Sequence, residues 1–186
     1  MAKLIYVSNL SVDGYTEDER GAFDWATPNS DVFMFTTNIL RSVGTYLYGR
    51  RMYETMAVWE TDATLAAQSD LTSDFAAVWK SGSKIVYSTT LGSVSTVDTT
   101  LEHHFDLGAL RDLKATSSSD LIVGGPNLAE QILMAGLVDE CHLFIWPVIL
   151  GGCKPALPAN TRAKLELLEQ CQFNNGVVYL RYRFLQ

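Results

Sequence analysis

Short apolar runs alternate with segments of helical periodicity along most of the chain. The apolar runs have the length of buried strands and lie at residues 3–10, 45–48, 84–87, 121–123 and 141–149. Apolar side chains at intervals of three and four predict helices at residues 28–43, 71–79, 107–115 and 126–133, and a further helix follows residue 49. This alternation predicts an α/β fold with a mixed central sheet flanked by helices.

The chain closes with two further strand-like runs, at residues 164–173 and 177–185. Asn174, Asn175 and Gly176 separate them, and Asn-Gly is typical of a hairpin because both residues adopt positive φ. We therefore expect a C-terminal antiparallel hairpin.

Some element boundaries depend on single residues. Gly44 and Gly136 are each expected to end a helix. Pro147 predicts an edge or a bulge within its strand, because proline cannot donate a ladder hydrogen bond. Residues 99–105 form one more candidate strand, whereas residues 58–69 are polar and variable and are assigned no element.

Composition and charge narrow the classes of function. The chain has 186 residues, 47% of them hydrophobic and 19% charged, which predicts one globular domain over residues 1–186. No apolar run reaches the roughly 20 residues of a membrane helix, and the first ten residues are typical of a strand, not of a signal peptide. We therefore expect a cytoplasmic protein with no membrane segment. The 14 basic and 21 acidic residues give a net charge of −7, which argues against nucleic-acid binding.

The cysteines and two of the histidines indicate no metal site. Cys141, Cys153 and Cys171 are widely spaced without a CxxC pair, so neither a disulfide framework nor a zinc site is expected. His103 and His104 have no acidic or cysteine partner at ligand spacing. We place these two histidines at the surface and edge of a strand.

The sequence LIVGGPNLAEQIL, residues 121–133, combines a strand, a turn and a helix. Gly124 and Gly125 follow the apolar run, and Pro126 stands where the first helical residue is expected. An anion can bind at such a turn, because free N–H groups meet the positive end of the helix dipole there. A dinucleotide phosphate and a tight connection without a ligand both fit this stretch, which is not GxGxxG.

A second strand–glycine–helix junction follows residue 48 and contains Gly49, Arg50 and Arg51. Positive charge at a helix N-terminus opposes the macrodipole, at a few tenths of a kcal/mol for each side chain. A bound phosphate would offset this, and so would a nearby carboxylate or solvation.

Hydroxyl groups follow a third strand at Ser88, Thr89 and Thr90. Side chains at the carboxyl ends of strands in an open α/β sheet are well placed to meet a ligand, although a turn or a helix cap is the commoner use of Ser and Thr. If the three strand ends gather at one edge of the sheet, they form a cradle for a phosphorylated nucleotide.

The loop after the first strand, residues 14–27, is polar and irregular but contains Phe23, Asp24 and Trp25. An aromatic pair around a carboxylate suits the wall of a pocket. It equally suits a loop that closes over the core.

Five segments in this order resemble the dihydrofolate reductase-like superfamily, and within it the RibD C-terminal type of riboflavin biosynthesis reductase. They are SVDG (11–14), YGRRMYETM (48–56), KIVYSTT (84–90), IVGGPNLAEQIL (122–133) and GLVDECHLFIWPVILGG (136–152). The resemblance covers nearly the whole chain. It implies a three-layer fold, a homodimer, and an NADPH-dependent reductase that transfers hydride to a small heterocyclic substrate, pteridine- or pyrimidine-like.

The resemblance also implies which residues bind NADPH. The phosphates would be met by Gly49, Arg50, Arg51 and Met52, and the pyrophosphate by Gly124, Gly125, Pro126, Asn127 and Leu128. The adenosine ribose and its 2′-phosphate would be met by Ser88, Thr89 and Thr90, and the nicotinamide would be flanked by Asn9, Leu10 and Asp13. Arginine near the 2′-phosphate favours NADPH over NADH.

The sequence departs from the family on the substrate side. Val123 stands where the riboflavin enzyme carries a glutamate, and Phe23 where it carries a serine, while Trp25 is kept. Asp31 is the nearest match to the carboxylate that holds the pteridine in the dihydrofolate reductase type, and Asp24 is an alternative.

A carboxylate near the cofactor is expected to orient the substrate or to relay a proton, and Asp24 and Asp13 are the two candidates. Two other functions fit the same sequence. One is a nucleotide-binding protein without catalysis, and the other is a domain that serves oligomerisation.

Overall fold

The computed structural model describes residues 2–152, 154–159 and 161–185, and its centre is one eight-stranded sheet. The strands are β1 (Leu4–Ser11), β2 (Tyr15–Glu17), β3 (Val43–Gly49), β4 (Ser83–Tyr87), β5 (Thr99–Glu102), β6 (Asp120–Gly124), β7 (Glu140–Trp146), β8 (Lys154–Pro155), β9 (Lys164–Gln172) and β10 (Val178–Leu185). The helices are α1 (Ser30–Leu40), α2 (Arg50–Thr61), α3 (Ala63–Ala66), α4 (Asp70–Ser81), α5 (Leu107–Thr116) and α6 (Pro126–Met134).

The large sheet is mixed, with the strand order β5-β4-β3-β6-β1-β7-β10-β9. The strands from β5 to β7 pair in parallel, whereas β10 pairs antiparallel with both β7 and β9. Strands β2 and β8 form a separate antiparallel pair. The predicted mixed sheet and C-terminal hairpin are both confirmed.

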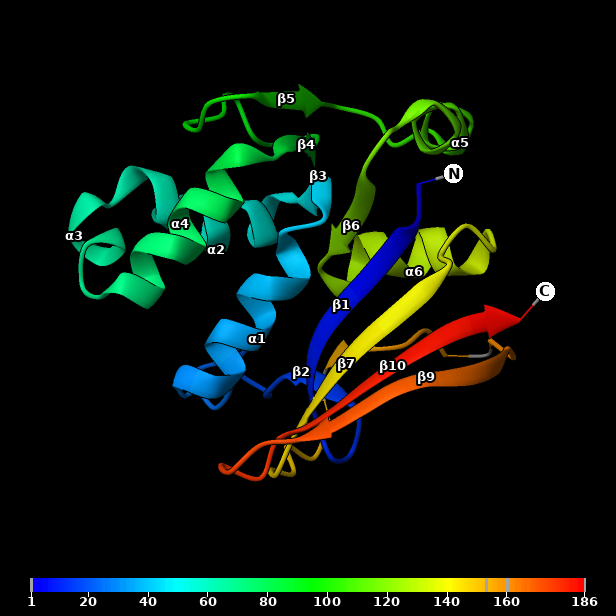
Figure 1. Cartoon of the computed structure of the whole chain (residues 1–186). Helices are drawn as coiled ribbons and strands as arrows, with labels where there is room; N and C mark the ends of the chain where they lie inside the picture. The colour runs from blue at the N-terminus through cyan, green and yellow to red at the C-terminus, as the bar shows by residue number, and fades with distance from the viewer. Residues whose placement is uncertain (1, 153, 160, 186) are drawn as a thin grey trace.

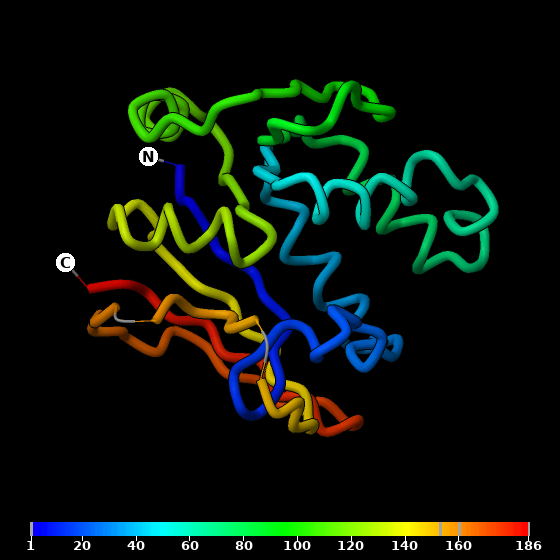
Figure 2. The backbone as a smooth tube through the Cα atoms, turned by 180° about the vertical axis from the view of Figure 1, so that it is seen from behind, coloured from blue at the N-terminus to red at the C-terminus, as the bar shows by residue number. Residues whose placement is uncertain are grey.

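Helices cover both faces of the sheet and make three layers. Residues of β6 alternate between two cores: Leu121 and Val123 pack in the core that contains α5 and α6, and Ile122 packs in the core that contains α1, α2 and α4. Figures 1 and 2 show these two groups of helices on opposite sides of the sheet. Strand β6 is therefore buried on both faces, which is why it reads as a continuous apolar run.

The first helix ends at Leu40, so the prediction that Gly44 ends it is wrong. Gly44 lies within β3, where an added Cβ would be 2.7 Å from the Cβ of Ser119. The glycine is required by this close approach of two chain segments and has no part in stopping the helix.

Three other boundaries differ from the prediction. The strand expected to reach residue 149 ends at Trp146, because Pro147 lacks the N–H that would continue the ladder. The strand expected over residues 99–105 ends at Glu102. The polar stretch 58–69 is largely helical: α2 continues to Thr61, and the side chain of Asp62 caps α3 by accepting two backbone N–H bonds.

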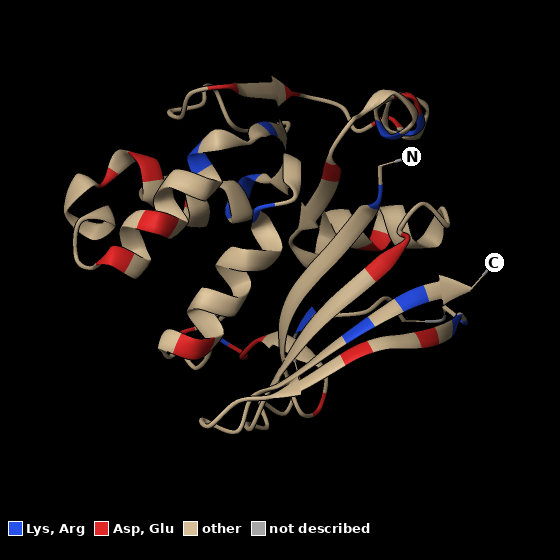
Figure 3. Cartoon of the chain, in the orientation of Figure 1, with Lys and Arg blue, Asp and Glu red and all other residues tan. Residues whose placement is uncertain are grey.

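The C-terminal hairpin turns where the sequence predicts and has a charged pairing across its strands. Gly176 adopts φ +85°, but Asn175 does not adopt positive φ, so the expectation that both residues do so is wrong. The turn is closed by the N–H group of Gly176, which donates to the carbonyl of Phe173 at 3.0 Å. Arg181 lies 3.5 Å from Glu169, and Arg183 lies 3.2 Å from Glu166, so basic residues of β10 face acidic residues of β9 (Figure 3). Within the ranges that the structure describes, no helix combines the length and the apolar character that a membrane span needs.

Candidate functional site

A cavity of about 740 Å³ opens beside the ends of β1, β3, β4 and β6. These strands are parallel neighbours in the sheet, so their carboxyl ends meet at one edge. Ligands of open α/β sheets bind at such an edge. The N-termini of α2 and α6 form the inner wall of the cavity, and the loop after β1 forms part of its outer wall.

The two arginines at the start of α2 line the cavity and are paired with carboxylates. Nε of Arg50 donates to Oε1 of Glu54 at 2.8 Å, and its Nη1 donates to Oγ1 of Thr90 at 3.1 Å. Nη1 of Arg51 donates to Oε2 of Glu17 at 2.6 Å. Of the three ways to offset charge at this helix start, the structure contains the carboxylate pairing for both side chains.

The two helices that begin at the cavity differ from the others at their N-caps. Side chains cap the remaining four helices: Asn29, Asp62, Ser69 and Asp106. The N-caps of α2 and α6 are Gly49 and Gly125, and neither makes a side-chain cap hydrogen bond. First-turn N–H groups have no acceptor within a helix, so those of α2 and α6 are left for another partner.

The turn before α6 needs glycine at both of its positions. Gly125 has φ +90°, a conformation that side-chain-bearing residues rarely adopt. A Cβ on Gly124 would lie 2.7 Å from a ring carbon of Tyr48 and 3.1 Å from Cγ of Met52. The absence of side chains therefore lets the starts of α2 and α6 lie close together.

The hydroxyl group of Ser88 makes a tight turn after β4. Its Oγ accepts the N–H groups of Thr90 at 3.2 Å and Leu91 at 3.0 Å. The carbonyl of Ser88 lies 2.9 Å from Nδ1 of His103, which also lines the cavity. Ser88 therefore stabilises a turn, which is one of the two roles expected for these hydroxyl groups. The other role, contact with a ligand, stays a prediction.

Aromatic side chains and an amide lie at the end of β1. Nε1 of Trp146 donates to Oδ1 of Asn9 at 2.9 Å. Because the indole can only donate, this bond fixes the carboxamide with its NH₂ group turned away from Trp146. Trp25 packs edge-on against Trp146 at 6.5 Å between ring centroids, and Phe23 lines the same cavity.

Glu17 supplies a carboxylate to the cavity. It lies on β2 opposite Lys154 of β8, and its side chain is only 14% exposed. Among the described lining residues it is the one Asp or Glu. Because Arg51 binds both Glu17 and the carbonyl of Gly21, it fastens this loop to the start of α2.

Comparison with known proteins identifies the family. A family model described as the RibD C-terminal domain matches residues 2–179. The chain belongs to the RibD C-terminal domain family. It is 28% identical over 177 residues to the uncharacterized protein YyaP of Bacillus subtilis (strain 168), covering 94% of this chain and 91% of that protein.

Solved structures confirm the fold of this RibD C-terminal domain. A putative riboflavin biosynthesis protein from Shewanella sp. PV-4 superposes with a TM-score of 0.77 at 21% identity, over 100% of both chains. The dihydrofolate reductase from Enterococcus faecalis, complexed with NADP(H) and RAB-propyl, gives a TM-score of 0.65 at 10% identity, over 99% of this chain and 97% of that one. The expected RibD C-terminal type is confirmed by the family model, and the three-layer fold is confirmed by these structures.

Most of the site residues expected for a RibD C-terminal domain line the one cavity. They come from the ends of four strands, from two helix starts and from the loop after β1: Asn9, Phe23, Trp25, Gly49, Arg50, Arg51, Met52, Ser88, Thr89, Gly124, Gly125, Pro126, Asn127 and Leu128. Residues up to 119 positions apart in the chain therefore meet as the sequence predicts.

Six expected site residues lie outside this cavity. Leu10 and Val123 are buried in the core that contains α5 and α6, and Val123 has no exposed surface. Asp31 is exposed and lines a separate depression of about 330 Å³ beside Phe35 and the turn of the hairpin. Thr90 does not line the cavity, but its hydroxyl group accepts a hydrogen bond from Arg50, which does.

The two expected catalytic carboxylates also lie outside the cavity. Asp24 is exposed, and its backbone carbonyl accepts the hydroxyl group of Thr27. The carboxylate of Asp13 accepts the N–H groups of Leu150 at 3.1 Å and Gly151 at 2.8 Å. Hydrogen bonding by Ser11, together with these two N–H groups, lowers the pKa of Asp13. In this geometry Asp13 fastens the loop after β7.

Sequence reasoning missed several lining residues: Val7, Ser8, Thr16, Glu17, Ala26, Thr55, Met56, Tyr87, His103, Phe105, Gln131 and Lys154. Thr55 and Met56 follow the Gly49 junction by one to two helical turns, which is a usable signal. No local sequence signal marks Glu17 or Lys154, because these two residues meet only through the pairing of β2 with β8.

Proposed function

We propose that this protein is an NADPH-dependent reductase that transfers hydride to a small heterocyclic substrate, pteridine- or pyrimidine-like. One observation carries the proposal. Helices α2 and α6 have glycine N-caps without a side-chain cap, and both begin at the cavity. Free N–H groups and two positive dipole ends that converge on one cavity suit the phosphates of a dinucleotide.

The residues around the cavity fit this cofactor. First-turn N–H groups of α2 and α6 would hold its phosphates, and the glycine turn before α6 leaves room for the pyrophosphate. Arg50 with Ser88 and Thr89 would meet the adenosine ribose and its 2′-phosphate, since arginine is suited to bind phosphate through several N–H donors. When bound, the reduced nicotinamide supplies a hydride. The NADP(H) complex of the similar Enterococcus faecalis dihydrofolate reductase supports this choice.

We assign the substrate to the part of the cavity bounded by the loop after β1. The rings of Phe23 and Trp25 suit a planar heterocycle, and Asn9 offers an amide NH₂ group to its carbonyl or ring nitrogen. Glu17 lies in the cavity, whereas Asp13 and Asp24 do not, so the proposal gives Glu17 the task of orienting the substrate. Val123 is buried and has no contact with the substrate in this proposal.

The cytoplasmic location stays a prediction from the sequence composition, and the homodimer stays a prediction from the family resemblance. Sedimentation velocity tests the second of these directly.

A cofactor titration followed by a substrate panel tests the proposed function. NADPH is expected to raise the melting temperature and to bind with a change in its fluorescence, and a pteridine or pyrimidine substrate is expected to cause loss of NADPH absorbance. If NADPH at millimolar concentration neither binds nor shifts the melting temperature, the nucleotide site is refuted. Binding without oxidation across the panel would favour the nucleotide-binding protein without catalysis.

A further inference from the structure

His103 lies at the end of the cavity formed by β4 and the start of α2, and the proposed function leaves it without a part. It follows β5, and its Nδ1 lies 2.9 Å from the carbonyl oxygen of Ser88. Oγ of Ser88 lies 3.5 Å from Oγ1 of Thr90, which accepts a bond from Arg50 at 3.1 Å. The imidazole therefore contacts the main chain of Ser88, and the hydroxyl group of the same residue leads through Thr90 to Arg50.

The hydrogen bond to Ser88 determines what the other ring nitrogen of His103 can do. A carbonyl oxygen only accepts, so Nδ1 must carry the hydrogen in both protonation states. Nε2 is then the atom that changes: it accepts when the ring is neutral and donates when the ring is charged. Histidine is the side chain whose charge ordinarily changes between about pH 5 and 8.

We propose that His103 makes the preference of this site for a 2′-phosphorylated nucleotide depend on pH. The inference rests on the proposed function. A charged imidazole donates Nε2–H to a phosphate oxygen, whereas a neutral ring turns a lone pair toward it. The 2′-hydroxyl group of NADH both donates and accepts, so it can pair with either form of the ring. The pH dependence should therefore appear for NADPH and be absent for NADH.

The charged and titratable groups around His103 come from three segments. Arg50 of α2 and Tyr87 of β4 line the same cavity, and Glu102 and Asp106 lie one and three positions from His103 in its own segment. Burial, with the charges of Glu102 and Asp106, raises the pKa of Tyr87, so this phenol stays neutral near pH 7. Arginine keeps its charge at all these pH values, so Arg50 contributes to affinity without a pH dependence of its own.

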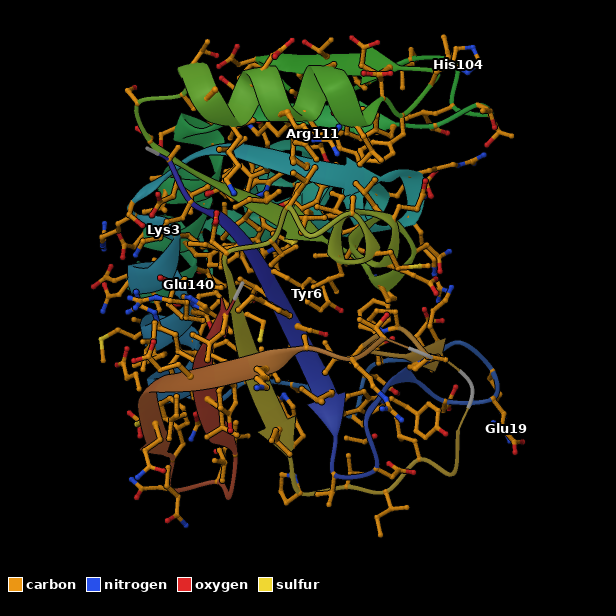
Figure 4. The ribbon with its side chains drawn as sticks, turned by 90° about the vertical axis from the view of Figure 1, so that its right-hand side faces the viewer. Lys3, Tyr6, Glu19, His104, Arg111 and Glu140 are labelled. Carbon is orange, nitrogen blue, oxygen red and sulfur yellow. The ribbon has the colours of Figure 1, made fainter. Side chains whose placement is uncertain are left out.

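His104 is a matched control for His103. The two residues are neighbours in sequence and both are exposed, but only His103 lines the cavity. Figure 4 shows His104 at the outer edge of the molecule. Substitution at His104 removes one imidazole from the same segment while it leaves the cavity unchanged.

Calorimetric titration of NADPH and NADH at about pH 6 and about pH 8.5 tests the inference. We expect His103→Gln to lower the affinity for NADPH about tenfold at the lower pH and less than about twofold at the higher pH, with NADH unchanged at both. The 2′-phosphate group titrates in the same range, so the wild type and each variant are compared at the same pH. His104→Gln is expected to match the wild type.

A second variant, His103→Lys, tests the effect of the positive charge directly. His103→Lys keeps a positive charge at both pH values, so it should hold NADPH at the higher pH as tightly as at the lower. Adenosine 2′,5′-bisphosphate should follow NADPH, and adenosine 5′-monophosphate should follow NADH. An equal loss for NADPH and NADH in His103→Gln, or the same loss at both pH values, overturns the inference alone. If the wild type binds neither dinucleotide, the proposed function fails and the inference fails with it.

Discussion

A carboxylate introduced at Gly49 is expected to stabilise the fold while it weakens cofactor binding. Gly49 is the N-cap of α2, with φ −78° and ψ 167°, which any residue adopts. A Cβ built on it meets no other atom within 4 Å. Gly49→Asp should therefore cap the first turn of α2, as Asp62 and Asp106 cap two other helices. The same carboxylate would occupy the place assigned to a phosphate.

The expected gain in stability of Gly49→Asp is smaller than its expected loss of binding free energy for NADPH. A new cap and the lower freedom of the unfolded chain add about 0.5–1 kcal/mol to the free energy of unfolding. For a protein of this length that raises the melting temperature by about 1–4 °C. A carboxylate about 5 Å from a phosphate, at an effective dielectric constant of about 20, disfavours binding by about 3 kcal/mol for each pair of unit charges. The affinity for NADPH should fall about 100-fold.

Thermal melts and a fluorescence titration with NADPH measure both effects on one protein. Gly49→Asn is the control, because asparagine caps the helix without a charge. It should give a similar melting temperature and a much smaller loss of affinity. A Gly49→Asp variant that melts higher and still binds NADPH like the wild type would refute the phosphate position at α2. A lower melting temperature would refute the capping argument.

Three further predictions concern stability. Gly125→Ala should lower the free energy of unfolding by about 1–3 kcal/mol in a urea titration, because its φ of +90° strains alanine. Lys84→Met should lower the free energy of unfolding by about 3–5 kcal/mol, because the lysine side chain is fully buried and its Nζ lies 3.6 Å from Oε2 of Glu60. The double variant Lys84→Met with Glu60→Leu should recover part of that loss in the same titration. Burial alone would raise the pKa of Glu140, but hydrogen bonds led by that of Arg181 outweigh it and hold the pKa at about 2. Because this folded-state pKa is depressed, about 3 kcal/mol of stability present above about pH 4.5 should be lost as pH falls toward 2. Glu140→Gln should remove that dependence from acid melts.

The two glycine junctions are readable from the sequence because each consists of consecutive residues. An apolar run, a glycine and a helical pattern within about ten positions predict where strand, turn and helix begin. The structure places Gly49 and Gly125 as helix N-caps at one cavity, as that pattern indicates. The parallel order of the strands then brings these local motifs to the same edge of the sheet.

The direction of side chains within the strands is not readable in the same way. Strand β6 is covered by helices on both faces, so its apolar run has no polar alternation to show which residues point where. Val123 and Leu10 turn out to face the core with α5 and α6. A residue next to a binding motif in sequence can therefore be buried away from the site.

The sequence by itself determined the order along the chain of the strands in the large sheet and of the helices that cover it, the C-terminal hairpin and the helix starts that can bind an anion. It did not predict β2, β8 or α3. Each of the predicted features depends on residues only a few positions apart, through backbone geometry and periodicity. Only the tertiary structure decided that Glu17 and His103, and neither Asp13 nor Asp24, line the cavity. Their positions follow from the pairing of β2 with β8 and of β4 with β5. The packing of the whole chain sets those pairings, and no local pattern encodes them.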